Sequence, residues 1–444
     1  MLSKRLTISL RSTAAVLTIL ATTASGVALA APAAAANRVT PGNFTGYGFD
    51  QCVAPSQYAM DRWLSHSPFL AAGIYISGAS RACRTQPNLT PAWISTQLRK
   101  GWRLLPITLG PQASCSTRFP RYGNDPVINW RPEDRYGKAR SQGRLEAVRA
   151  AHAASSLGIS KGSTLWYDLE AFDTRLEHCR ESALSFLSAW TRKMHRLGYV
   201  SGVYSSAASG IKMLDDAMTY RPGRYAMPDQ VWIADWNGRA SVHSSYVRRT
   251  SWMPHKRVHQ YRGPHNETHG GVTINIDSNF LDVGRGSTAP KARASCGVRI
   301  NYARYESLRL GSRSGQVPGL ECLLTNRRLF RNDLGPRFGR ATDEAVRAFQ
   351  RSQSLPVGGG MTRRTWVALL ADGHSPVVKR GSAGHPVRRA QRALNAAIGA
   401  GLPVTGVFDA RTAAAVRTYQ GRRGLARTGV VAESTWAHLK AGLS

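Results

Sequence analysis

Residues 164–170 read Thr-Leu-Trp-Tyr-Asp-Leu-Glu, the stretch that most clearly indicates the fold class. A short apolar and aromatic run is typical of a β-strand, and this one has two acids at its carboxyl end. Seven similar runs, rich in β-branched or aromatic residues, lie on either side of it. They are residues 45–50, 73–77, 104–109, 200–205, 231–235, 257–261 and 273–277.

Amphipathic stretches separate several of these runs. Residues 178–197 place large apolar side chains at helical spacing, and residues 140–157 form an alanine-rich stretch that ends at Gly158. Strands that alternate with helices predict an α/β fold, here a (β/α)8 TIM-type barrel over residues 40–284. Weaker helical patterns in residues 218–273 predict an irregular last third of the barrel.

A linker and an internal repeat follow the barrel region. Residues 285–296 lack large apolar side chains, which is typical of a linker. Beyond them, motifs recur at a constant offset of 70 residues: FGRAT at 338–342 returns as FDART at 408–412, and Thr365-Trp366 returns as Thr435-Trp436. The repeat predicts two small three-helix modules, residues 297–373 and 374–444.

Residues 1–36 predict a secretory signal peptide. Basic residues precede an apolar stretch that ends in small residues at 28–30 and 34–36. The alternative is a retained membrane anchor, but Ser, Thr and Gly dilute the stretch. We therefore expect a secreted or cell-wall-associated protein that makes no membrane contact after signal cleavage.

Positive charge dominates the composition. The chain has 60 Lys and Arg against 26 Asp and Glu, a formal net charge of +34. A field of this sign attracts polyanions, which include nucleic acid, anionic lipid and acidic cell-wall polymers. Export favours the wall polymers, and no motif supports nucleic-acid recognition. The oligomeric state does not follow from the sequence.

Six cysteines form an even set without a CxxC pair, which favours disulfides over a zinc cluster in an exported chain. The four in the barrel region allow three pairings, of which we favour Cys52–Cys83 with Cys115–Cys179. A bridge between the remaining two, Cys296 and Cys322, would tie the end of the linker to the first module.

Acidic residues stand at the ends of the predicted strands, where a barrel gathers its functional side chains. Strand alternation sends Asp168 and Glu170 to one face, with Cα atoms about 6.6 Å apart. One such carboxyl can hold a proton while the other is ionised, which is the division of labour that glycoside hydrolysis needs. The alternative is a solvated turn after the strand. The full set of acids is Asp50, Asp168, Glu170, Asp235 and Asp277.

Aromatic and amide side chains near other strand ends suit sugar binding, because ring faces stack on sugars and polar tips bond hydroxyls. Ordinary barrel filling is the alternative interpretation, most strongly for Trp232. With Asp235, the substrate-binding candidates are Tyr75, Tyr204, Trp232, Trp236, Gln260 and Tyr261.

Four histidines, at 255, 259, 265 and 269, form a series that suggests metal binding. Lys256, Arg257 and Arg262 are interleaved with them, and cations compete with a metal ion for such a site. We expect neither a metal nor a cofactor. GxSxG, HExxH and P-loop motifs are absent from the sequence.

The order of the motifs resembles a known family. GFD at 48–50, YDLE at 167–170, VWIADW at 231–236, HQY at 259–261 and IDSNF at 276–280 resemble the glycoside hydrolase family 25 lysozymes. They resemble more closely the glycoside-hydrolase-like domain of the secreted family numbered 1906 among domains of unknown function. The repeated modules resemble the peptidoglycan-binding domain type 1.

The resemblance covers about residues 45–283 and implies a muramidase-like barrel. It implies Glu170 as proton donor, Asp168 as its charged partner, and Asp50 and Asp277 as the rest of an acidic floor. The leading hypothesis is a secreted cell-wall glycan hydrolase that acts on peptidoglycan and is anchored by two wall-binding modules. The alternative is a non-catalytic peptidoglycan- or carbohydrate-binding protein with a hydrolase-like barrel, because fold alone does not establish activity.

Overall fold

The computed structural model describes residues 36–121, 124–292 and 296–444. The predicted signal peptide lies outside these residues, apart from Ala36. Within the described parts of the chain, no helix combines the length and the hydropathy that crossing a bilayer requires.

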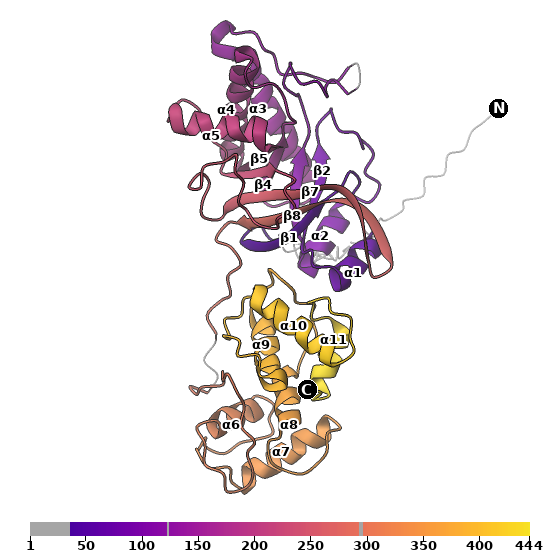
Figure 1. Cartoon of the computed structure of the whole chain (residues 1–444), viewed down its shortest axis with the longest axis vertical. Helices are drawn as coiled ribbons and strands as arrows, with labels where there is room; N and C mark the ends of the chain where they lie inside the picture. The colour runs from indigo at the N-terminus through magenta and orange to yellow at the C-terminus, as the bar shows by residue number, and fades with distance from the viewer. Residues whose placement is uncertain (1–35, 122–123, 293–295) are drawn as a thin grey trace, which may run out of the picture. The chain divides into compact units, whose positions relative to one another are not determined.

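Eight strands close into one barrel in sequence order, as predicted (Figure 1). The first six strands pair in parallel, and β6 pairs in parallel with β7. The strands are β1 (Phe44–Asp50), β2 (Ala71–Ser77), β3 (Arg103–Thr108), β4 (Thr164–Asp168), β5 (Val200–Ser206), β6 (Gln230–Ala234), β7 (Lys256–His269) and β8 (Val272–Val283).

The last strand differs from the all-parallel barrel that the sequence predicts. β8 runs antiparallel to both β7 and β1. Only Gly270 and Gly271 separate β7 from β8, with φ of 60° and 80°, and a two-residue connection forms a hairpin, whereas a parallel crossover needs a dozen residues or more. Asp277 therefore lies within β8 rather than at its carboxyl end.

Helices cover the barrel between most strands. Helices α3 and α4 correspond to the two predicted helices and pack against each other (Figure 1). Residues 235–255 contain no helix, which agrees with the predicted irregular last third. The barrel helices are α1 (Gln57–His66), α2 (Pro91–Lys100), α3 (Glu133–Ser156), α4 (Glu177–Leu197) and α5 (Lys212–Tyr220).

Strand β4 is buried on both faces. The ring of Trp166 contacts Trp232 inside the barrel, whereas Tyr167 contacts Phe186 and Trp190 of α4 outside it. On β5, a Cβ at Gly202 would lie 2.4 Å from the Trp166 ring, so this close approach requires glycine. Alternation along β4 then sends Asp168 to the inner face with Trp166.

The repeat corresponds to two three-helix modules whose buried apolar residues form one continuous cluster. Each module buries an equivalent glutamine, Gln350 or Gln420, whose amide bonds the loop before the last helix. The first module contains α6 (Val317–Thr325), α7 (Arg340–Ser352) and α8 (Arg363–Ala371); the second contains α9 (His385–Ile398), α10 (Ala410–Arg422) and α11 (Glu433–Lys440).

The six cysteines form three disulfides in the favoured pairing, Cys52–Cys83, Cys115–Cys179 and Cys296–Cys322. The first joins the loops after β1 and β2, the second joins the loop after β3 to α4, and the third fixes the start of the first module to α6. In the loop-entropy view, each bridge stabilises the fold mainly by restricting the unfolded chain.

The packing of β4 against β5 leads to a stability prediction. Gly202→Ala should lower the free energy of unfolding by about 1–3 kcal/mol, because the new methyl group collides with the Trp166 ring. Urea unfolding followed by tryptophan fluorescence measures the change. Gly358→Ala is the matched control, since its Cβ meets nothing within 4 Å. Equal effects of the two substitutions would contradict this packing.

Candidate functional site

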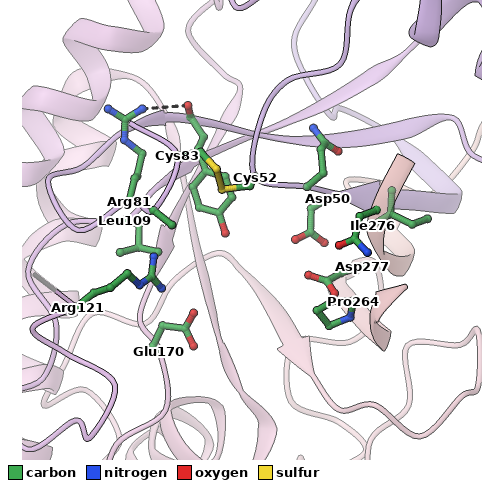
Figure 2. A pocket seen from close by; sticks show the side chains of 14 residues that line it. Asp50, Cys52, Arg81, Cys83, Leu109, Arg121, Glu170, Pro264, Ile276 and Asp277 are labelled. Carbon is green, nitrogen blue, oxygen red and sulfur yellow. Dashed lines mark hydrogen bonds between the residues drawn. A yellow bond between two sulfur atoms is a disulfide. The ribbon is translucent and has the colours of Figure 1, made fainter. Parts of the chain in front are cut away.

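A cavity of about 230 Å³ opens at the end of the barrel where the parallel strands finish. Asp50 ends β1, Asp277 lies on β8, and Glu170 follows β4 by two residues. All three line the cavity (Figure 2). Tyr75 also belongs to its lining. The barrel thus brings together three of the four acids that the resemblance assigns to catalysis.

Asp50 and Asp277 are direct partners across the antiparallel β1–β8 pair. Figure 2 shows their carboxyl groups directed toward one another. Burial raises the pKa of Asp277 to about 8, and the charges of Asp50 and Glu170 add to this rise. Burial also raises the pKa of Asp50, to about 6. At neutral pH, Asp277 therefore holds a proton while Asp50 is mostly ionised.

Two amides keep the pKa of Asp50 below that of Asp277. Asn279 Nδ2 donates to Asp50 Oδ1 at 2.6 Å, and Gln260 Nε2 donates to the same oxygen at 3.2 Å. Trp232 in turn donates to Asn279, and Tyr204 and Trp236 donate to Gln260. Hydrogen bonds to the charged form favour ionisation, which opposes the effect of burial.

Asp168 lies below the floor of the cavity rather than in its lining. Asp168 is only 1% exposed, and its Oδ2 accepts a hydrogen bond from the hydroxyl of Tyr75 at 3.2 Å. Oδ1 has no hydrogen-bond partner among the described residues. Burial raises the pKa of Asp168 well above its usual range, with a further contribution from the charge of Glu170.

Glu170 is held by two groups from the loop after β3. Gln112 Oε1 accepts the backbone N–H of Glu170 at 2.8 Å, while Gln112 Nε2 donates to the carbonyl of Asp168. Arg118 Nη1 donates to Glu170 Oε2 at 2.9 Å. These contacts fix the backbone of the Asp168–Glu170 segment and pair one carboxylate oxygen with a cation.

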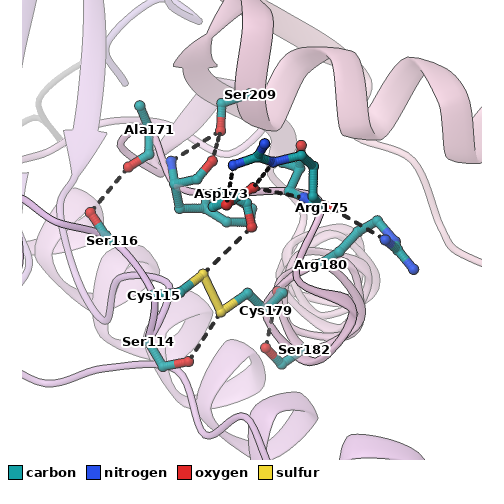
Figure 3. The surroundings of a disulfide bond; sticks show 12 residues. Ser114, Cys115, Ser116, Ala171, Asp173, Arg175, Cys179, Arg180, Ser182 and Ser209 are labelled. Atoms are coloured by element: carbon teal, nitrogen blue, oxygen red, sulfur yellow. Dashed lines mark hydrogen bonds and ion pairs between the residues drawn. A yellow bond between two sulfur atoms is a disulfide. The ribbon is translucent and has the colours of Figure 1, made fainter.

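The Cys115–Cys179 disulfide anchors this loop to α4 (Figure 3). On the same loop, Ser116 Oγ donates to the carbonyl of Ala171 at 3.1 Å, directly after Glu170. The disulfide thus fixes this loop to α4, and the Ser116 hydrogen bond fixes it to the segment that carries Glu170. Both contacts help to position Arg118 beside Glu170.

A second cavity, of about 320 Å³, lies on the other side of Glu170. Glu170 and Arg118 line it with Tyr204, Asp235 and Trp236. The Trp236 side chain is 62% exposed and lies against Gly263, where a Cβ would come within 2.8 Å of the ring. An open aromatic face beside hydrogen-bonding groups is suited to a sugar ring.

The remaining candidates from the sequence lie elsewhere. Trp232 and Gln260 are buried at 0% and 1% exposure, so they support Asn279 and Asp50 instead of reaching a ligand. Tyr261 lines neither cavity. These three residues therefore line neither cavity, because inward-facing barrel side chains fill the core as well as the site. A substrate-binding role for them stays a prediction.

The sequence interpretation did not include Asn279, Gln112, Arg118, Arg81 or Arg121. Arg81 and Arg121 line the first cavity on the wall opposite Asp50 and Asp277 (Figure 2). Asn279 had a usable signal, because it follows Asp277 by two residues and so shares its face of β8. The other four come from loops, whose positions no periodicity predicts.

The histidine series is engaged in other contacts. His255 lies 2.9 Å from Asp282, and His265 and His269 both contact Glu267. His259 contacts the carbonyls of Ser241 and Asp235. Among the described residues, no group of three or more His, Cys, Asp or Glu side chains is arranged to hold a metal ion.

Three solved structures are similar to part of the chain, each over 53% of its length. An uncharacterized B. stearothermophilus protein is 17% identical with a TM-score of 0.33, and 95% of that chain is covered. The Mycobacterium tuberculosis Tat-secreted protein Rv2525c, in complex with L-tartrate, is 14% identical with a TM-score of 0.36 and 95% coverage. The modular autolysin LytC from Streptococcus pneumoniae is 10% identical with a TM-score of 0.33 and 46% coverage.

Family models match both parts of the chain. Residues 61–281 match the Rv2525c-like, glycoside hydrolase-like domain. Residues 324–369 and 383–439 each match the putative peptidoglycan binding domain. No curated protein sequence is significantly similar to the chain. The protein therefore carries an Rv2525c-like, glycoside hydrolase-like domain followed by two putative peptidoglycan binding domains.

Proposed function

We propose that the protein is a secreted, muramidase-like hydrolase that cleaves the sugar backbone of peptidoglycan. The observation that carries the proposal is the position of Glu170, which lines both cavities and shares the first of them with Asp50 and Asp277. A sugar chain that occupied both cavities would place a glycosidic bond at Glu170. Two peptidoglycan-binding modules would hold the barrel on its polymeric substrate and raise the local concentration of cleavable bonds.

The proposed roles follow from the surroundings of each acid. Glu170 gives a proton to the glycosidic oxygen as the bond from that oxygen to the anomeric carbon breaks. Arg118 must first release Oε2 of Glu170, or the proton must come from Oε1. Ionised Asp50 stabilises the positive charge at the anomeric carbon, and protonated Asp277 donates a hydrogen bond to the substrate. Water then adds to that carbon, and its proton restores Glu170.

Asp168 does not touch the substrate in this proposal, because it is buried below the first cavity. Burial raises its pKa well above the usual range, and its Oδ2 accepts a hydrogen bond from Tyr75, so Asp168 helps to position this cavity-lining ring. Trp236, Tyr204 and Asp235 of the second cavity bind the neighbouring sugar. The predicted signal peptide and the three disulfides support a location outside the cytosol, where peptidoglycan is accessible.

One observation favours the alternative, a carbohydrate-binding barrel that performs no chemistry. Arg118 forms an ion pair with Glu170, the proposed acid, and a carboxylate held by a cation in this way is suited to binding rather than to giving up a proton. A hydrolase and a binding protein differ in one product, the new reducing end, so a single assay separates them.

Glu170→Gln should lower the release of reducing ends from purified peptidoglycan by about 10²–10⁴-fold, because the amide cannot supply the proton. Binding to sedimented peptidoglycan should not change. Glu177→Gln is the matched control, since Glu177 is exposed at the start of α4 and its loss should leave hydrolysis intact. Wild-type protein that binds the wall but releases no reducing ends would establish the non-catalytic alternative.

The dependence of kcat/KM on pH should be bell-shaped. Activity should rise as Asp50 loses its proton near pH 6 and fall as Asp277 loses its proton near pH 8. Asp277→Asn keeps a neutral hydrogen-bond donor at this position, so the variant should lose the alkaline limb of the profile. An alkaline limb that persists unchanged in Asp277→Asn would assign that limb to another group.

A further inference from the structure

A third cavity, of about 680 Å³, lies between the start of the first module and helix α9 of the second. Five cationic or basic side chains line it, and the described lining residues include no Asp or Glu. Its walls also include Asn301 and Leu323, and residues 290–292 of the linker. The five are Lys291, Arg299, His385, Arg388 and Arg392.

Arg392 is the buried centre of this cavity. The residue is 5% exposed, and its Nε donates to Asn301 Oδ1 at 3.0 Å. Its terminal nitrogens, Nη1 and Nη2, donate no hydrogen bond to any described residue, and neither is fully buried. A guanidinium buried to this degree, with both ends of its fork unpartnered and open to a cavity, is arranged to bind a ligand.

Other cations increase the local charge. Arg388 is 8% exposed, and one terminal nitrogen donates to the carbonyl of Pro290. Burial lowers the pKa of Arg392; Tyr305 opposes this shift, and the charges of Arg388 and Arg327 add to it. Burial likewise lowers the pKa of His385, with the charge of Arg392 as the next cause. Placing several cations together in a partly buried cavity costs free energy, because they repel one another and lose hydration, unless a bound anion neutralises them.

The repeat shows that this charge is not required by the three-helix fold. At the offset of 70 residues, His385, Arg388 and Arg392 of α9 correspond to Gly315, Pro318 and Cys322 of the first module. The first module therefore folds with no charge at these positions. The Cys296–Cys322 disulfide meanwhile fixes the start of the first module, which supplies Arg299 and Asn301 to the opposite wall.

We propose that this cavity binds a phosphate group of an anionic cell-wall polymer. Phosphate suits it because the planar fork of an arginine pairs with two phosphate oxygens, and several cations can share one phosphate. The volume exceeds that of a single small ion, which favours a phosphodiester within a longer chain. The polymer as the source of the phosphate rests on the proposed wall location, whereas binding of phosphate itself does not.

Isothermal titration of the purified full chain tests the proposal with three probes: inorganic phosphate, poly(glycerol phosphate) and acetate. We expect saturable phosphate binding, tighter binding of the polymer per phosphate, and no binding of acetate. Arg392→Gln should weaken phosphate binding by about tenfold or more. Arg411→Gln removes an equal charge from an exposed site on α10 and should leave the affinity unchanged.

Three results would overturn the proposal. Wild-type protein that binds neither phosphate nor the polymer would refute the site without the need for any variant. An equal loss of phosphate affinity in Arg392→Gln and Arg411→Gln would show that binding depends only on the net charge of the protein. Acetate that binds as tightly as phosphate would show that the cavity does not select phosphate. Inorganic phosphate that binds as tightly as the polymer would refute the polymer as ligand. The titration measures binding and not hydrolysis of peptidoglycan. Its outcomes therefore do not depend on whether the barrel is a hydrolase.

Discussion

The antiparallel pairing of β8 with β1 is the constraint on which the site depends. This register places Asp277 directly opposite Asp50, although the two residues are distant in sequence. Figure 2 shows the two carboxyl groups directed toward one another, and two partly desolvated carboxyls that repel each other cannot both ionise cheaply. This repulsion favours one protonated and one ionised member. The amides of Asn279 and Gln260 bond only Asp50 and so decide which member is ionised.

The rest of the barrel supports this arrangement. Trp232, Tyr204 and Trp236 hold the two amides in orientation, so the aromatic core and the acidic site form one hydrogen-bonded network. On the opposite side, Gln112 fixes the Asp168–Glu170 segment, and the Cys115–Cys179 disulfide anchors the loop that carries Arg118. A barrel with this network is suited to chemistry at a rigid site, because the positions of its charges are set before a ligand arrives.

The sequence predicts those features that depend on local pattern. Period-two and helical spacing located the strands and helices, and the constant offset revealed the modules. The strand-end rule selected Asp50, Asp168, Glu170, Asp235 and Asp277, of which Asp277 lies within β8 rather than at its carboxyl end. It did not predict the direction of β8, although Gly270-Gly271 is a hairpin signal. Nor did it find Gln112 or Arg118, which reach Glu170 from more than 50 residues away along the chain. Long-range contacts between loops leave no periodic trace in a sequence.

Carboxyl-detected NMR titration would follow the ionisation of Asp50 and of Asp277 separately, because it reports on each carboxyl group at its own resonance. We expect transitions near pH 8 for Asp277 and near pH 6 for Asp50. In Asp50→Asn the transition of Asp277 should move to lower pH, since the charge of Asp50 contributes to its raised pKa. Transitions near pH 4 for both groups, unaffected by the substitution, would show that the two carboxyl groups neither share the site nor repel one another.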